Sequence, residues 1–144
     1  MPSSSKPRKK HRPRLVARPV YAQMHRDLVT PPRAAILALE RVSDRESLVA
    51  ARHTLASFLS YMAAALDGAG YETGPVVAGM TALQSVIDRE KRTGAYRASG
   101  SELIALRDAV NFCDDAIPML DTAKLAAGML KVDAVYRKLE APGC

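Results

Sequence analysis

The chain has 144 residues, of which 48% are hydrophobic and 25% charged, a composition that fits one globular domain. Its formal net charge of +6 is unevenly distributed. The first 20 residues hold seven cations and no acid, whereas the other 124 hold 14 basic and 15 acidic groups and carry a net charge of −1. This segregation argues against a uniformly basic, histone-like fold. It predicts two parts, a basic arm over residues 1–20 and a nearly neutral domain over residues 21–144.

Targeting and membrane segments are not indicated. No run approaches the roughly 18 to 20 apolar residues that a membrane span requires. The basic N-terminus lacks the apolar segment of a secretory signal, and four prolines in 20 residues disfavour the amphipathic helix of a mitochondrial presequence. We therefore expect a cytoplasmic protein. Cys113 falls in an apolar helical pattern and is expected in the core, and Cys144 ends the chain, so no disulfide framework is indicated.

The basic arm is the strongest functional signal. It combines three consecutive serines, a run of cations and no aromatic residue, so it buries too little apolar surface to offset its ordering entropy. We expect it to be disordered on its own. A flexible cationic chain releases counterions from phosphates, which gives salt-dependent, sequence-tolerant binding of nucleic acid. The predicted nucleic-acid-binding residues are Lys6, Arg8, Lys9, Lys10, Arg12, Arg14 and Arg18.

The first helix signals follow the arm. Residues 21–28 fit either a short helix or an extended lead-in. Thr30 before Pro31 and Pro32 predicts an N-cap with proline in the first turn. The helix that follows presents Ile36, Leu37, Leu39 and Val42.

The longest periodic pattern comes next. The segment from Ser43 to Glu46 has the spacing of a capping box, and Gly68 and Gly70 supply a stop signal. Between them, apolar residues recur at steps of three and four, as one face of a helix requires. These positions are Leu48, Ala51, Leu55, Phe58, Leu59, Met62 and Leu66.

Three more segments complete the pattern. A third helix is predicted from about Pro75 to before Gly94, and a fourth opens with the capping-box spacing of Ser99 and Glu102. Pro118 should kink or end the fourth helix. The last helix is predicted from Asp121 or Thr122. The apolar positions of these helices are Val76, Met80, Leu83, Ile87, Leu103, Leu106, Val110, Cys113, Ile117, Leu125, Met129, Val132, Tyr136 and Leu139.

Together these signals predict an all-α fold, an antiparallel bundle of four to five helices preceded by a disordered basic arm. Loops of under ten residues favour antiparallel neighbours. The same spacings would suit a coiled-coil seam between two chains. Because the apolar faces of one domain can close on themselves, we favour a monomer, and a homodimer stays open as the alternative.

No enzyme signature is found, and we expect no catalytic residue, metal or cofactor. His11, His25 and His53 are far apart, and neither cysteine has a CxxC partner. The glycines at 68 and 70 follow a helix rather than a strand, so they do not form a phosphate-binding loop. The serines have no apparent base nearby.

Four acidic residues cluster between positions 108 and 121. Asp108 and Asp115 are seven residues apart, as are Asp114 and Asp121, so each pair would share a helix face if the helix continued past Pro118. Two carboxylates on one face can hold a cation or exchange protons. We favour a solvated face, with Asp115 or Asp121 capping the next helix.

A second, smaller group of cations closes the third helix. Lys91, Arg92 and Arg97 could form a secondary patch for an anionic partner, especially if the arm lies close to it. Cations at this position also complement the helix dipole, which is a sufficient structural reason for them. A helix-turn-helix motif is disfavoured because the connections are longer than its tight turn.

The basic leader from Lys6 to Arg14, followed by a short helical domain, resembles small accessory proteins encoded by bacterial phages and prophages. The stretches from Ile87 to Gly94 and from Ser101 to Asp108 resemble the second half of such proteins. The resemblance covers the leader and about 40 further residues, through motifs of low specificity. It implies a small regulatory or host-modulating role, with no catalytic residues to carry over.

Two functional hypotheses follow. The first is a non-enzymatic nucleic-acid-binding accessory or regulatory protein that contacts phosphates through the arm. The second is a protein-interaction module that binds and inhibits a host protein, for instance one of defence or nucleic-acid processing, with the arm supplying electrostatic attraction.

Overall fold

The computed structural model describes residues 18–41, 44–94 and 97–140. Over these residues the chain forms five α-helices, one short 3-10 helix and no strand, which confirms the predicted all-α fold class. Strand-like pairing in this part of the chain is limited to a bridge between Pro19 and Asp121. Of the helices described, none is long and apolar enough to cross a membrane.

The first of these helices, α2, spans Ala22–Glu40 and holds Pro31 and Pro32 in its interior. The predicted N-cap at Thr30 is therefore wrong, and the ambiguous lead-in is helical from residue 22 onward. The Thr30 hydroxyl donates instead to the carbonyl of Arg26, at 2.8 Å. An interior proline costs a helix about 3 kcal/mol or more. That cost is offset by packing of the buried side chains, which are Val29, Pro32, Ala35, Ile36 and Leu39.

Helix α3 spans Arg45–Gly68, and every apolar position predicted for it is buried. Its N-cap is Asp44, whose carboxylate accepts from the Ser47 amide at 2.8 Å. The Ser47 hydroxyl also donates to this carboxylate, and the two hydrogen bonds from Ser47 lower the pKa of Asp44. The residue predicted as the cap, Ser43, lies outside the described residues. The predicted stop is confirmed, since Gly70 has a φ of 82° just after the helix ends.

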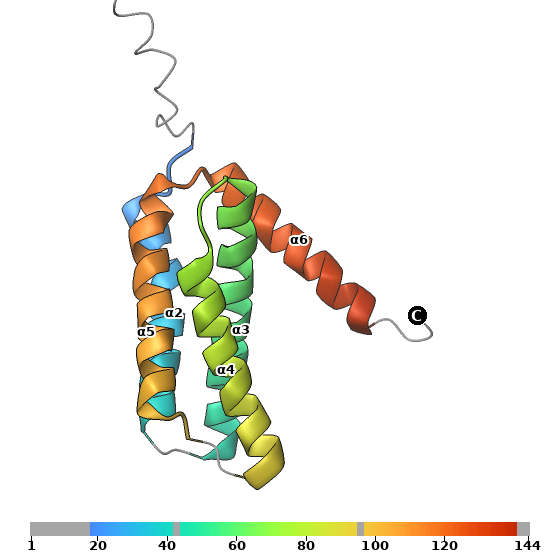
Figure 1. Cartoon of the computed structure of the whole chain (residues 1–144). Coiled ribbons are helices and arrows are strands. Elements are labelled where there is room, and N and C mark those ends of the chain that lie inside the picture. The colour runs from blue at the N-terminus through green and yellow to red at the C-terminus, as the bar shows by residue number, and fades with distance from the viewer. Residues whose placement is uncertain (1–17, 42–43, 95–96, 141–144) are drawn as a thin grey trace, which may run out of the picture.

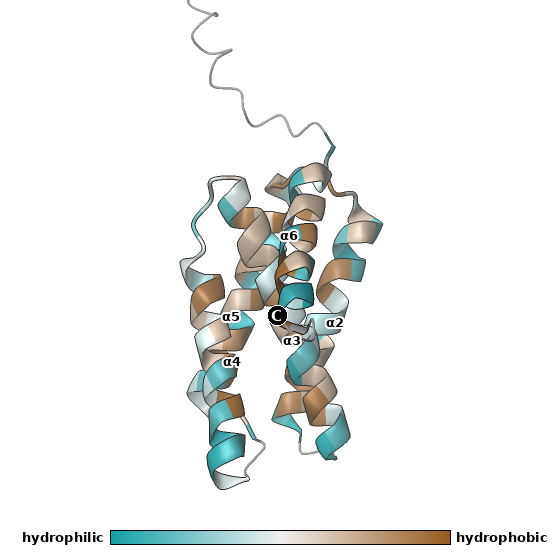
Figure 2. Cartoon of the chain, turned by 90° about the vertical axis from the view of Figure 1, so that its right-hand side faces the viewer, coloured by the Kyte–Doolittle hydropathy of each residue, from teal (hydrophilic) through white to brown (hydrophobic). Residues whose placement is uncertain are grey.

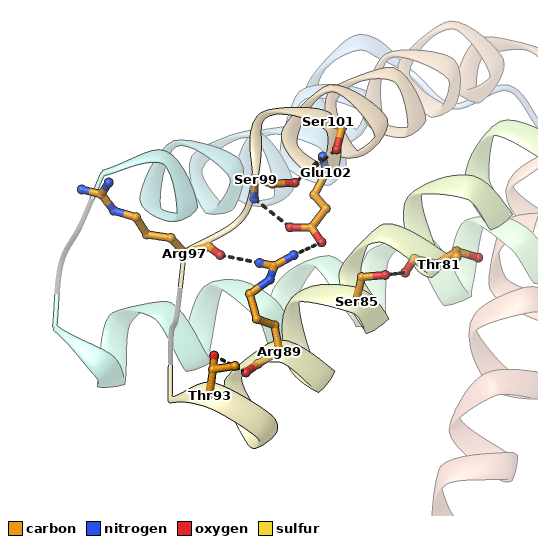
Figure 3. Close-up of polar contacts among 8 residues, drawn as sticks. All are labelled: Thr81, Ser85, Arg89, Thr93, Arg97, Ser99, Ser101 and Glu102. Atoms are coloured by element: carbon orange, nitrogen blue, oxygen red, sulfur yellow. Dashed lines mark hydrogen bonds and ion pairs between the residues drawn. The ribbon is translucent and has the colours of Figure 1, made fainter.

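Helices α4 and α5 begin and end as local chemistry predicts. Helix α4 spans Gly74–Thr93 and carries a proline in its first turn. It is followed by Gly94, the C-cap, which has a φ of 79°. Helix α5 spans Gly100–Ala116 and has the complete predicted capping box. Ser99 and Glu102 exchange both bonds of this box (Figure 3).

Pro118 ends α5, as predicted, by converting its end into the 3-10 helix η2, Ile117–Met119. The last helix, α6, spans Thr122–Glu140. Asp121 caps it, because its carboxylate accepts from the Ala123 amide at 2.7 Å. Asp114 is in α5, whereas Asp121 precedes α6, so the two share no helix face.

Helices α2 to α5 form a closed ring in which each helix packs against two others (Figure 1). Two ion pairs join neighbouring helices of this ring. Glu40 at the end of α2 pairs with Arg107 in α5, and Arg89 near the end of α4 pairs with Glu102 at the start of α5. The fully buried side chains inside the ring include Leu55, Leu59, Leu66, Val76, Leu106 and Val110.

Helix α6 lies outside this ring and packs on α3 (Figure 1). At the crossing, a Cβ on Gly128 would lie 2.7 Å from the backbone nitrogen of Ala65, so only glycine permits this approach. Further along, the Tyr61 hydroxyl donates to Asp133 at 2.9 Å. Beyond that point α6 diverges from the bundle.

The divergence leaves apolar side chains of α6 exposed. Leu125 is buried as predicted, but Tyr136 is 40% and Leu139 is 75% exposed. The expectation that the apolar faces close on themselves is therefore wrong for the second half of α6 within the described residues. Figure 2, which is turned by 90°, shows α6 in front of α3 rather than inserted between helices.

Candidate functional site

The root of the basic arm is fixed to the bundle. The Arg18 carbonyl accepts from the Thr122 amide at 2.8 Å, Pro19 pairs with Asp121, and Val20 is buried. Arg18 itself is exposed. These contacts hold the start of the described chain against the start of α6. The other predicted contact residues, Lys6, Arg8, Lys9, Lys10, Arg12 and Arg14, lie outside the described residues.

The secondary cationic patch is partly assembled by the structure. Lys91 and Arg92 are exposed in the last turn of α4, and Arg97 is exposed in the connection to α5. The Arg97 carbonyl accepts from Arg89 at 2.8 Å, while its guanidinium points away from this bond (Figure 3). The three predicted cations therefore lie at the same end of the bundle with accessible charges.

Glu102 organises the connection beside this patch. Its carboxylate accepts from Arg89 and from the Ser99 amide, so one buried acid links α4 to the cap of α5 (Figure 3). Burial by itself would raise the pKa of Glu102, but the hydrogen bonds from Arg89 and Ser99 outweigh it and lower the pKa. The Glu102 carboxylate therefore stabilises the connection between α4 and α5.

The arm root and the secondary patch lie at opposite ends of the bundle. Arg18 is bound where η2 meets α6, whereas Lys91 and Arg92 end α4 at the far end (Figure 1). A 20-residue helix such as α4 is about 30 Å long. Among the described residues, then, Arg18 and the patch do not form a single surface.

A cationic hollow that sequence reasoning missed lies between α3 and α4, beside the patch. It has a volume of about 440 Å³, and its lining includes Arg45, Arg52, Glu90 and Lys91. Glu90 is largely buried and pairs with Arg52 and, at 3.3 Å, with Arg45. Burial and the charge of Arg45 lower the pKa of Arg52. Glu90 in α4 is 38 residues from Arg52 and 45 from Arg45, both in α3, so no local motif could reveal this pairing.

Asp114 joins α5 to α2 through a second network that the sequence did not indicate. His25 donates to one of its carboxylate oxygens and Arg33 to the other, both at 2.6 Å. Arg33 also donates to Asn111 at 2.9 Å. The hydrogen bond from Arg33 lowers the pKa of Asp114, and the bond from His25 adds to this effect against that of burial. This acid is a structural ion-pair centre.

Asp108 and Asp115 share one face of α5, as their spacing predicts. Both line a shallow hollow of about 560 Å³ between α4 and α5, together with the exposed Ile104 and the half-buried Phe112. Neither carboxylate has a hydrogen-bond or ion-pair partner within residues 18–41, 44–94 and 97–140. The hollow therefore combines an apolar floor with two free negative charges.

Groups suited to metal or thiol chemistry are not assembled in the part of the chain that the structure describes. It contains no cluster of three or more potential metal ligands. Cys113 is buried as predicted, and burial raises the pKa of its thiol to about 12. At neutral pH this thiol is protonated and serves as a small core side chain. Cys144 lies outside the described residues.

Comparison of the chain with protein-family models, with curated proteins and with solved structures finds no match. The resemblance to phage accessory proteins therefore stays a prediction. Three features of this chain could bind a partner, which are the cations of the arm, the secondary cationic patch and the acidic hollow on α4 and α5.

Proposed function

We propose that this protein is a non-enzymatic accessory or regulatory protein of the cytosol that binds nucleic acid through its basic arm. The single observation that carries the proposal is the concentration of seven cations, without one acid, in the first 20 residues of a chain whose remainder is nearly neutral. Charge concentrated in this way favours phosphate contact over base recognition. The exposed Arg18, held at the root of the arm, connects these cations to the folded domain.

The secondary patch supports the same proposal from the opposite end of the bundle. Lys91, Arg92 and Arg97 present exposed cations that can meet a second group of phosphates. Because this patch is small and near paired acids, its contribution is expected to be weaker than that of the arm. Binding through both would be tolerant of sequence, since neither feature reads base edges.

The salt dependence of binding tests the proposal. Fluorescence anisotropy with a labelled duplex would compare the full chain with a variant in which the six cations from Lys6 to Arg14 are replaced by Gln. If all six contact phosphates of B-form DNA, the slope of log K against log salt should change by about 5. A matched variant with Lys91, Arg92 and Arg97 replaced by Gln should change the slope by less. An unchanged affinity and slope in the six-fold variant would refute the proposal.

A second candidate function is a protein-interaction module that inhibits a host protein, acidic or nucleic-acid-binding. The observation that favours it is the exposed apolar surface of α6, where Leu130 is 66% and Leu139 is 75% exposed. Affinity purification from a host lysate with and without nuclease separates the candidates. A stoichiometric protein partner that survives nuclease favours this second function, and a partner lost with the nucleic acid favours the first.

A further inference from the structure

The hollow on α4 and α5 follows α5 for several helical turns. Its α5 side is a continuous stripe of residues spaced by three and four positions, from Ser101 to Asp115, which extends for about 21 Å. Its apolar residues are Ile104, 58% exposed, and the half-buried Phe112, which lie one helical turn to either side of Asp108. Asp108 and Asp115 are seven residues apart, and neither has a partner among the described residues.

The outward face of α6 carries the complementary pattern. Opposite its contact with α3, it presents an exposed stripe with the same three- and four-residue spacing. The stripe consists of Ala127, Leu130, Lys131, Ala134, Arg137 and Lys138. Its cations have no hydrogen-bond or ion-pair partner in the described part of the chain.

The two stripes match in both charge and repeat. Asp108 and Asp115 are separated by seven residues, as are Lys131 and Lys138, so each pair lies about 10.5 Å apart along its helix. Both ion pairs can therefore form at the same time. Leu130, one residue before Lys131, is placed by this pairing at the Phe112 end of the hollow.

The occupant of the hollow must come from another molecule. Helix α6 is held on α3 by the close approach of Gly128 to Ala65 and by the bond from Tyr61 to Asp133, and its cationic stripe faces away from the bundle. It cannot reach the hollow of its own chain without losing these contacts. A second copy of the chain offers both the complementary stripe and the complementary hollow.

We propose that this protein self-associates by placing the outward face of α6 of one copy in the α4–α5 hollow of a second copy. Reciprocal exchange of two α6 helices closes the assembly as a symmetric dimer. In it, Lys131 and Lys138 face Asp115 and Asp108 of the other copy. The protrusion of α6 from the ring leaves this face open for such a contact (Figure 1). This proposal is independent of nucleic-acid binding.

Charge reversal tests the pairing. The full chain, of 15.6 kDa, should show a concentration-dependent doubling of mass in light scattering or sedimentation up to about 1 mM. The variants K131E/K138E and D108K/D115K should each weaken association by roughly 10-fold or more, because each sets like charges against one another. An equimolar mixture of the two variants should restore it, since both interfaces of the mixed dimer are again complementary.

The control is D67K/E72K, which makes the same change of net charge as D108K/D115K, at exposed acids outside both stripes. It should associate as the parent does, and circular dichroism should show all variants folded. A parent that stays monomeric over the whole concentration range overturns the proposal. Association that persists in K131E/K138E also overturns it, because the contact would then involve cations other than those of α6. A mixture of the two variants that fails to restore the dimer overturns it as well.

Discussion

The crossing of α4 and α5 allows a prediction in which two destabilising substitutions cancel each other. Gly79 is buried at this crossing, and a Cβ placed on it would lie 2.5 Å from the Cβ of Ala109. Real side chains essentially never show such a separation, and both atoms are fixed to helix backbone. Gly79→Ala must therefore push the two helices apart by about 1 Å. Because neither Cβ can move independently of its helix, we expect a cost of about 2–3 kcal/mol, in the upper part of the range for overpacked cores.

Helix propensity acts against this cost. Alanine in a helix interior is favoured over glycine by about 1 kcal/mol, so Gly79→Ala should destabilise the protein by a net 1–2 kcal/mol. Ala109→Gly alone should cost a similar amount, because it loses propensity and leaves a methyl-sized void. In the double variant the clash is gone, since the next atoms around a Cβ at residue 79 lie at 3.5 Å or more. Its stability should come within about 0.5 kcal/mol of the parent.

Urea denaturation followed by circular dichroism measures all four proteins. The expected order places the double variant above both single variants, with a coupling free energy of about 2–3 kcal/mol. Gly68→Ala is the matched control, because a Cβ there meets nothing within 4 Å and should not destabilise. A Gly79→Ala variant as stable as the parent, or single effects that simply add, would refute the close crossing.

Three further predictions follow from the polar contacts and the buried thiol. Ser99→Ala removes half of the capping box and should lower the free energy of unfolding by about 1 kcal/mol in urea denaturation, whereas Ser101→Ala should change it little. Because the fold lowers the pKa of Asp114, this ion-pair centre stabilises the protein above the ordinary pKa of 3.8 and loses its effect as the pH falls below it. Arg33→Gln should therefore reduce stability near neutral pH, and the difference from the parent should shrink toward zero in acid, while a constant difference would contradict the assignment. In a Cys144→Ser background, Cys113 should react with a thiol reagent only as fast as the protein opens, because its pKa is about 12, and rapid labelling in native buffer would contradict its burial.

Local chemistry predicted most helix boundaries, because the residues that set them are neighbours in sequence. The serine of the capping box at residue 99 and the left-handed glycine at residue 94 act within one turn. The prediction failed at Thr30, where three residues with strong start signals lie inside α2. There the burial of α2 against the core outweighs the local preference of Thr-Pro-Pro for a helix start. The sequence pattern does not show how much surface a helix will bury.

The sequence predicted less of the candidate site than of the helix boundaries. The spacing of Asp108 and Asp115 correctly placed them on one face, but it could not show that the face borders a hollow. The pairing of Asp114 with His25 joins residues 89 positions apart, and only the packing of α2 on α5 brings them together. Likewise, the apolar periodicity of α6 indicates which face is apolar but not how much of that face another helix covers.

Because α6 packs on a single neighbour, we expect it to unfold locally before the helices of the ring. Lifting any helix out of the ring disrupts two packed interfaces, whereas lifting α6 disrupts mainly its contact with α3. Local opening is cheapest where the fewest contacts are lost, so amide exchange and protease cleavage should begin in α6. The four ring helices bury their core residues against each other, so they should remain protected after a protease has removed α6.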